Sequence, residues 1–578
     1  MIGALLRLLA PCLLLADAAP ALLFRDARQP LARRLDDLVS RLSQAELIGQ
    51  LAGPAVVGLP RLNVSGAAFM GECLAGLGAV NVSTSWPMPV ALAASFDEGL
   101  LASVSSAMAS EARAHHSAFG AWKPGPGGDL PPYGRGWDST CLVPQLNIYR
   151  DPRWGRNYET LGESPLVISR LGSAVIRGLQ GCESKAACEA LAARGGAMKL
   201  AAVAKHAFAY NLECFGPNRY PTCGWSRHSF DAVVSTRDLN TSYLRQWRDA
   251  VGAGLSGAMC SYNSVGGVPA CANSQLLRDR MRRDWGFGGM VISDAGAVDG
   301  VWGCDKTNPV LHDRACHNYT HDAVDATSAA FTAGCDLNYG SAYAGHLATA
   351  VARGQVSMAA IKASVKNVFR PRLMTQMEAS LTDPATIPGG DAYARIDFGV
   401  VDSAEHRELA RAAAAQSTVL LTNHHSTLPL AASGGGKATV ALIGEHTGGD
   451  WSAPIRDGCF HFNGTVCTPF WQVVPAEVLG GGEHGLPMSL ARLRFHTAVS
   501  QRTEEHLPRS IRCSSHFGPA SSASATRSAS RLAVRPPHAT ARIARPSMPA
   551  AQLGTVSSIR RSGLLRLSRP HRTQMLWW

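Results

Sequence analysis

The stretch D-W-G-F-G-G-M-V-I-S-D-A-G, residues 284–296, decides the fold class of this 578-residue chain. Its apolar run, Met290 to Ile292, is partly β-branched and follows two glycines, which is typical of a buried strand. Asp294 stands where that strand would end, and Gly296 allows the chain to turn away. Catalytic groups of α/β barrels lie at strand ends, so Asp294 is a candidate nucleophile. The alternative is an aspartate that caps a following helix.

The same order of elements recurs along the chain: an apolar run, then polar residues, then a stretch with helical spacing. The apolar runs are residues 142–148, 200–204, 257–260, 290–292 and 335–337, and helical spacing occurs in 31–51, 95–116, 239–251 and 324–333. Such alternation predicts an α/β fold with parallel strands and crossover helices. Closure into a (β/α)8 TIM-type barrel would place the polar strand ends on one rim. A doubly wound sheet is the alternative, although no G-x-G-x-x-G motif follows a strand.

The net charge of +12 comes almost entirely from the C-terminal end. Residues 501–578 hold 13 arginines, no lysine and only two acids, which leaves 42 basic and 41 acidic residues in the first 500. The charge of the main part therefore does not indicate a nucleic-acid partner. We expect residues 479–578, rich in Ser, Ala, Arg and Pro, to be a disordered low-complexity tail or misread coding sequence.

Several features predict a secretory protein. Residues 1–24 combine Arg7, a Leu/Ala-rich run and small residues at 16–19, as a signal peptide does, and no later segment predicts a membrane span. Five N-x-S/T sequons begin at Asn63, Asn81, Asn240, Asn318 and Asn463. Close cysteine pairs, namely Cys214/Cys223, Cys260/Cys271 and Cys304/Cys316, suit short-loop disulfides, with free buried thiols as the alternative.

Motifs in family order extend over residues 45–470. They are residues 58–61, 71–76, 150–156, 162–165, 205–206, 227–231, 260–271, 291–294 and 333–337. Together they resemble the N-terminal barrel domain of family 3 glycoside hydrolases, and most closely its plant- and fungal-type β-xylosidase branch. The resemblance implies a barrel domain over 25–385 and a partial second α/β sandwich domain over 403–475.

The resemblance also implies site roles. Asp294 matches the nucleophile of a retaining, exo-acting β-glycosidase, and the family's sugar-binding positions match Glu72, Arg156, Lys205, His206, Arg227 and Tyr262. From the residues alone, Lys205 and His206 also fit a buried ion-pairing unit that shapes a loop. The expected substrate is an oligosaccharide or aryl glycoside. We expect no metal, no organic cofactor, no nucleic acid and no membrane partner, and the histidine pair at 115–116 is expected on a solvated surface.

Two departures from the family pattern weaken this expectation. Ala75 stands where the family usually has histidine. The general acid/base glutamate usually lies in the second domain, and none of the carboxylates after Trp471 has a recognisable context, so the chain looks truncated there. β-Glucosidase, α-arabinofuranosidase and an inactive carbohydrate-binding homologue therefore remain alternatives.

Overall fold

The computed structural model describes residues 22–430, apart from 54, 70, 79, 81, 122–135, 215–225 and 304–315, together with 459–462 and 466–469. Most of the expected signal peptide and the tail at 479–578 lie outside these residues. The same holds for residues 431–458, 463–465 and 470–475 of the expected second domain.

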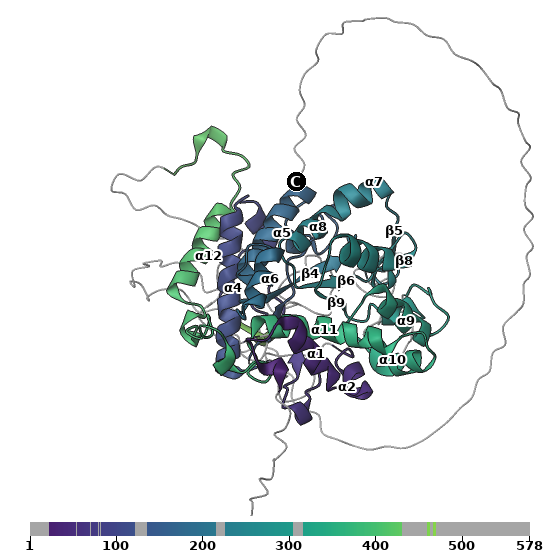
Figure 1. Ribbon diagram of the computed structural model, residues 1–578. Coiled ribbons are helices and arrows are strands. Elements are labelled where there is room, and N and C mark those ends of the chain that lie inside the picture. Colours follow the sequence, from purple (N-terminus) through teal and green to yellow (C-terminus); the bar gives the residue numbers. More distant parts are fainter. Residues whose placement is uncertain are drawn as a thin grey trace, which may run out of the picture. The chain divides into compact units, whose positions relative to one another are not determined.

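A parallel four-stranded sheet forms the centre of the fold, in the order β3-β4-β6-β9 (Figure 1). Its strands are Thr140–Cys141, Ala201–Ala207, Gly257–Cys260 and Met290–Ser293. Parallel bridges from Gln145 to Lys205 and from Leu337 to Ile292 extend the pairing on both sides. The predicted α/β class with parallel strands is confirmed, and β6 and β9 form where the apolar runs predict them.

Helices surround these strands, with α5 packed on β4 and α11 on β9 (Figure 1). The α-helices are α1 Leu31–Ser40, α2 Gln44–Gly49, α3 Pro89–Ala93, α4 Glu98–Phe119, α5 Pro165–Gln180, α6 Lys185–Ala193, α7 Thr236–Asp238, α8 Arg245–Gly252, α9 Ala323–Ala333, α10 Ala342–Ala352, α11 Met358–Thr375 and α12 Ala404–Gln416. Two π-helical stretches are Leu239–Tyr243 and Gln275–Asp284.

Short elements complete the described part. The 3-10 turns are Leu23–Arg25, Pro60–Leu62, Asn157–Glu159, Ala270–Ala272, Asp299–Val301, Pro384–Thr386, Phe398–Val400 and His424–Ser426. The remaining strands are β1 Ala55–Val56 and β2 Ala67–Ala68, β5 Asp231–Ala232, β7 Ser264–Val265 and β8 Val268–Pro269, and the antiparallel pair β10 Cys459–Phe462 and β11 Val466–Pro469.

The helical spacing over residues 31–51 is divided between two helices because Ser43 starts a new one. The Ser43 hydroxyl accepts from the backbone N–H of Glu46, and the Glu46 carboxylate accepts from the backbone N–H of Ser43. This reciprocal capping box favours a helix start over a helix interior. The helical spacing is therefore confirmed as two helices, α1 and α2.

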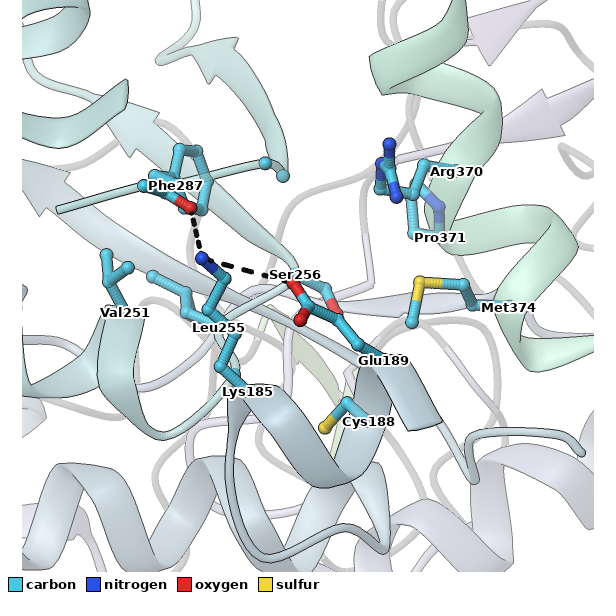
Figure 2. A pocket seen from close by; sticks show the side chains of 14 residues that line it. Lys185, Cys188, Glu189, Val251, Leu255, Ser256, Phe287, Arg370, Pro371 and Met374 are labelled. Carbon is cyan, nitrogen blue, oxygen red and sulfur yellow. Dashed lines mark hydrogen bonds and ion pairs between the residues drawn. The ribbon is translucent and has the colours of Figure 1, made fainter. Parts of the chain in front are cut away.

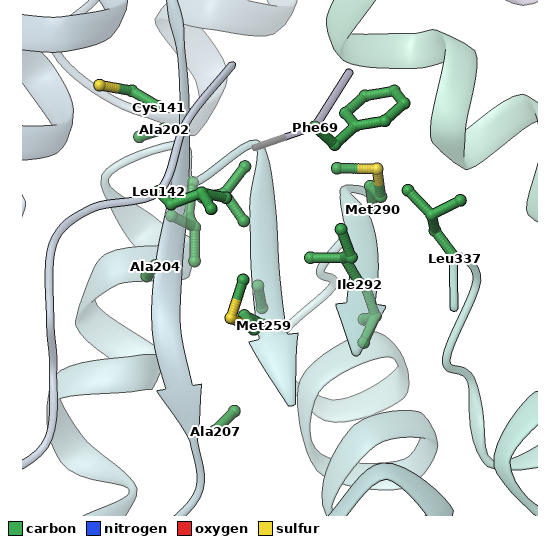
Figure 3. Close-up of a cluster of buried hydrophobic side chains, with 14 of the residues drawn as sticks. Phe69, Cys141, Leu142, Ala202, Ala204, Ala207, Met259, Met290, Ile292 and Leu337 are labelled. Carbon is green, nitrogen blue, oxygen red and sulfur yellow. The ribbon is translucent and has the colours of Figure 1, made fainter. Parts of the chain in front are cut away.

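The interior of the sheet is apolar, and its side-chain alternation sets the direction of Asp294. Met290 and Ile292 are fully buried in a cluster with Met259 and Leu337 (Figure 3). Since successive side chains of a strand alternate, Asp294 continues the same face as Met290 and Ile292. The strand follows Gly289, where an added Cβ would lie 2.3 Å from the carbonyl oxygen of Ser256.

Disulfides join Cys73 to Cys141, Cys182 to Cys188 and Cys260 to Cys271, so the predicted Cys260/Cys271 pair is confirmed. Cys214 and Cys316 are also disulfide-bonded. Their predicted partners, residues 223 and 304, lie outside the described residues. None of the described helices is long and apolar enough to cross a bilayer.

Helix α12 packs on α3 and α4 through a buried carboxylate. Glu111 of α4 accepts from the backbone N–H of Asp402 at 3.1 Å, and its Oε1 lies 2.7 Å from Nδ1 of His406. Burial alone raises the pKa of Glu111, but hydrogen bonds from His406 and Thr84 outweigh burial and lower it. Helix α12, the first helix of the expected second domain, is therefore held against α4 of the expected barrel domain.

Candidate active site

The carboxyl ends of β4, β6 and β9 bring the predicted site residues together. Lys205 and His206 lie at the end of β4, Tyr262 follows β6, and Asp294 follows β9. The pairing of β4 with β6 shifts register between residues 204 and 207. Such irregularities re-aim side chains and are frequent beside active sites.

Asp294 has one carboxylate oxygen, Oδ2, that accepts no hydrogen bond from the described residues. Oδ1 accepts from the backbone N–H of Ala295 at 2.8 Å, while Oδ2 is buried and makes no hydrogen bond within the described residues. The side chain is 12% exposed. No α-helix starts at Asp294, and the next one, α9, is capped by Asp322, so the helix-cap alternative is wrong.

His206 lies beside Asp294 as a neutral imidazole. Its Nε2 is 3.4 Å from Asp294 Oδ2 and 3.2 Å from an Arg156 nitrogen. Because arginine only donates, Nε2 accepts that bond and the ring proton sits on Nδ1. Burial, together with the charges of Arg156, Lys205 and Arg227, lowers the pKa of His206 well below its usual range. The contact with Asp294 is therefore not an ion pair.

Lys205 bonds to Glu72 across the sheet end. Its Nζ lies 2.6 Å from Glu72 Oε2, and a quarter of the Glu72 side chain reaches solvent whereas Lys205 is buried. Burial raises the pKa of Glu72, and the positive charge of Lys205 opposes that effect. The interpretation as a buried ion-pairing unit is correct for Lys205 but not for His206, and the sugar-binding role of both residues stays a prediction.

Arg156 is held by Glu159, which was missed as a candidate. The guanidinium donates to both carboxylate oxygens, at 2.5 and 2.8 Å, and Glu159 is almost fully buried. Burial alone raises the pKa of Glu159, but the charge and hydrogen bonds of Arg156 outweigh it and lower that pKa. The three-residue spacing of Arg156 and Glu159 in the sequence could have indicated that the two side chains pair.

Arg227 lies against Tyr262 and bonds to Glu213, another residue that was missed. The Arg227 guanidinium stands 4.4 Å over the ring of Tyr262, and its Nη1 donates to Glu213 at 2.8 Å. Burial and then the negative charge of Asp294 raise the pKa of Tyr262 well above its usual value, so its hydroxyl stays protonated. No local pattern pointed to Glu213, whose partner is 14 residues away in the sequence.

Tyr210, also missed, closes the group. Its ring packs against His206 and Tyr262, with centroids 5.2 and 5.9 Å apart, and its hydroxyl bonds to Glu213. Each of the cations Lys205, Arg156 and Arg227 thus bonds to a carboxylate other than Asp294. The arrangement leaves Oδ2 of Asp294 without a hydrogen bond among the described residues, as a nucleophilic carboxylate oxygen requires.

A small hollow lies at the opposite end of the sheet, around the amino ends of β6 and β9 (Figure 2). Lys185 there donates to the carbonyl of Gly286 at 2.6 Å and lies 3.9 Å from Glu189. The hollow has a volume of about 60 Å³, which suits a few water molecules. In α/β barrels this end serves stability and the other end binds ligands, so we assign it no ligand.

One cluster of potential metal ligands occurs among the described residues: Cys260, Cys271 and the free, buried Cys335. Two of these sulfurs are joined in a disulfide. Since the thiolate is the metal-binding form of cysteine, the cluster lacks a usable ligand set in this state.

The sequence of this sheet and its polar rim matches a known family. Residues 138–370 fit the glycosyl hydrolase family 3 N-terminal domain. This part of the chain belongs to glycosyl hydrolase family 3. The matched residues contain Asp294, Arg156, Lys205, His206, Arg227 and Tyr262, whereas Glu72 precedes them.

Curated relatives of this chain include a probable β-D-xylosidase 6 of Arabidopsis thaliana. It is 32% identical over 420 residues, which cover 69% of this chain and 48% of the relative. A probable exo-1,4-β-xylosidase of Aspergillus clavatus is 33% identical over 441 residues, or 73% of this chain and 49% of the relative. The chain thus spans about half the length of the curated relatives it matches.

Two solved structures share the fold. A family 3 exo-β-xylosidase in complex with a xylobiose aziridine probe is 27% identical, with a TM-score of 0.58 over 72% of this chain and 48% of that one. A β-glucosidase from Listeria innocua is 25% identical, with a TM-score of 0.51 over 69% of this chain and 53% of that one.

Proposed function

We propose that this chain is a retaining, exo-acting β-glycosidase that acts on β-xylosides, with Asp294 as its nucleophile. The observation that carries the proposal is the unbonded Oδ2 of Asp294 at the carboxyl end of β9, beside Arg227, Tyr262 and neutral His206. The xylosidase names of the relatives support the sugar class. We further propose that the parallel sheet closes into a (β/α)8 barrel, as the family membership suggests.

In the proposed reaction, Oδ2 of Asp294 attacks the anomeric carbon while the glycosidic oxygen leaves and takes a proton from a general acid. Water then loses a proton to the deprotonated general acid, attacks the same carbon and releases the sugar from Asp294. We propose that Glu72, Arg156, Lys205, His206, Arg227 and Tyr262 bind the sugar hydroxyls. Neutral His206 suits this role because it adds no charge that would pair with Asp294.

No described carboxylate is assigned as the general acid. Glu159 and Glu213 are buried and bonded to arginines, and Glu72 is bonded to Lys205. The candidates after Trp471 lie outside the described residues. A positioned acid contributes on the order of 10²–10⁴-fold in rate, so we expect activated aryl xylosides to react much faster than xylobiose.

Labelling with 2,4-dinitrophenyl 2-deoxy-2-fluoroxyloside tests the nucleophile. We expect one fluoroxylosyl group per chain, mapped to the peptide that contains Asp294, and no label on Asp294→Ala. The control Asp299→Asn removes a nearby carboxylate that bonds to Ser341 instead, and it should label normally. A label on another residue would contradict the assignment.

A carbohydrate-binding role without turnover is the second candidate, since the chain spans about half of its relatives. Xylose binding by calorimetry, with neither labelling nor hydrolysis of the aryl xyloside, would favour it. Hydrolysis of the aryl xyloside but not of xylobiose would instead indicate an intact nucleophile without its acid. The β-glucosidase and α-arabinofuranosidase alternatives are tested by the matching aryl glycosides.

We also propose that the protein enters the secretory pathway. The exposed side chains of Asn63, Asn240 and Asn318 in their sequons are accessible to glycosylation. A cleavage site at residues 16–19 would lie upstream of Phe24, which is fully buried in the core. Glycosidase digestion of the protein secreted from a eukaryotic host tests both points.

A further inference from the structure

Glu72 reaches the site from an irregular loop rather than from a strand end. Residues 71–78 form neither helix nor strand, and loops hold a functional group less precisely than strands do. Oε2 of Glu72 lies 2.6 Å from Nζ of Lys205, while Oε1 makes no hydrogen bond among the described residues. Because hydrogen bonds span only about 2.7–3.2 Å, Oε1 can accept from a sugar hydroxyl only if the loop keeps its place.

The residue after Glu72 is bonded to the sheet. Cys73 forms a disulfide with Cys141, the last residue of β3, and both cysteines are fully buried. Cys141 pairs with Ala202 of β4, and Lys205 lies three residues further along β4. The disulfide therefore joins the loop to the same pair of strands that carries Lys205, the partner of Glu72.

Backbone contacts hold the loop on both sides of the disulfide. The carbonyl of Gly71 accepts from the N–H of Leu142 at 2.7 Å, and the carbonyl of Glu72 accepts from the N–H of Gly78 at 2.7 Å. Gly71 also has no room for a side chain, because an added Cβ would lie 2.6 Å from the ring of Trp137. The disulfide adds a covalent link that limits how far this close-fitting loop can move from β3.

We propose that Cys73 and Cys141 are positioning residues, whose disulfide holds the carboxylate of Glu72 at the sugar subsite. This inference rests on the proposed function, because it needs Glu72 to bind sugar hydroxyls. A disulfide that served stability alone would change the unfolding midpoint but not the affinity for sugar. Positioning instead predicts a loss of affinity that disappears once the Glu72 carboxylate has been removed.

The test measures the xylose affinity of four chains by calorimetry, well below their unfolding midpoints. The chains are wild type, Cys73→Ala with Cys141→Ala, Glu72→Gln, and the variant with all three changes. We expect Glu72→Gln to raise the Kd about tenfold, as the loss of one hydrogen bond to a charged group does. Loss of the disulfide should raise the Kd about fivefold in the wild type, but less than about twofold in the Glu72→Gln background.

Labelling kinetics with 2,4-dinitrophenyl 2-deoxy-2-fluoroxyloside separate binding from chemistry. Intact mass at several reagent concentrations gives the maximal rate and the half-saturating concentration. Without the disulfide, the half-saturating concentration should rise about fivefold, whereas the maximal rate should stay within about twofold. The reason is that Asp294 follows β9, which is paired with β6 and is not bonded to the Glu72 loop.

The matched control removes a disulfide outside the site, with Cys182→Ala and Cys188→Ala. Cys188 lines the hollow at the opposite end of the sheet. This change should lower the unfolding midpoint but leave the Kd for xylose unchanged. Should the chain without the Cys73–Cys141 disulfide fail to fold, Cys73→Ala with Cys141→Val restores buried volume and is measured in its place.

The outcomes separate the two claims. An unchanged xylose affinity without the disulfide refutes the positioning role. Equal losses with and without the Glu72 carboxylate also refute it, because the disulfide would then act on another part of the site. A wild type that binds xylose but acquires no label refutes the proposed nucleophile, and the affinities still decide the positioning role. A wild type that does neither refutes both.

Discussion

Replacing Glu159 by glutamine tests whether the buried Arg156–Glu159 pair supports the site. The pair is bidentate, with the arginine 14% and the glutamate 2% exposed. Removing one partner of such a pair typically costs about 3–5 kcal/mol. Because glutamine keeps one acceptor, we expect the lower limit, about 3 kcal/mol. With a urea dependence of about 3 kcal/mol per molar, the unfolding midpoint falls by about 1 M.

The assay is urea unfolding followed by tryptophan fluorescence, with Glu408→Gln as the control. Arg411 and Glu408 have the same three-residue spacing and the same bidentate distances, but their side chains are 64% and 63% exposed. That change should not move the midpoint measurably. A double variant, Arg156→Met with Glu159→Leu, should recover most of the lost stability, since it leaves no unpaired charge. Equal shifts for Glu159→Gln and Glu408→Gln would refute the reasoning, because burial would then not matter.

Three further predictions concern stability. Burial lowers the pKa of His115 and His206, so below pH of about 6.5 the unfolded chain binds protons that the folded chain does not. As the pH falls below that value, the free energy of unfolding should decrease by up to about 1.4 kcal/mol per pH unit for each histidine. Melting curves from pH 8 to 5 measure this dependence, and the variant His115→Gln should show a weaker one. Removing the Cys260–Cys271 disulfide, with a separation of 11, should cost about 3 kcal/mol. Removing Cys182–Cys188, with a separation of 6, should cost about 2 kcal/mol, so urea midpoints should fall in that order. Gly178→Ala should destabilise by about 1–3 kcal/mol, because its Cβ would meet the carbonyl of Ala102 at 2.2 Å, whereas Gly345→Ala in α10 meets nothing and should raise the melting temperature.

The strands that carry Asp294 and Tyr262 could be predicted because both are short apolar runs with polar ends. The rule that parallel strands end on one side then grouped the site residues. The acidic partners Glu159 and Glu213 were missed, because burial turns a carboxylate into a partner for arginine and sequence does not show burial. His115 was wrongly expected at the surface for the same reason: it lies between Phe119 and Phe398.

Because there is no room for a side chain at Gly289, the start of β9 is fixed, and the length of the strand sets the position of Asp294. Its start is fixed by the carbonyl of Ser256, and five residues later the chain delivers Asp294. One residue inserted between Gly289 and Asp294 would turn the carboxylate to the opposite face of the sheet. Two inserted residues would keep its face but move it along the strand direction by about 6.6 Å. Variation that this protein tolerates should therefore change the identity of those residues but never their number.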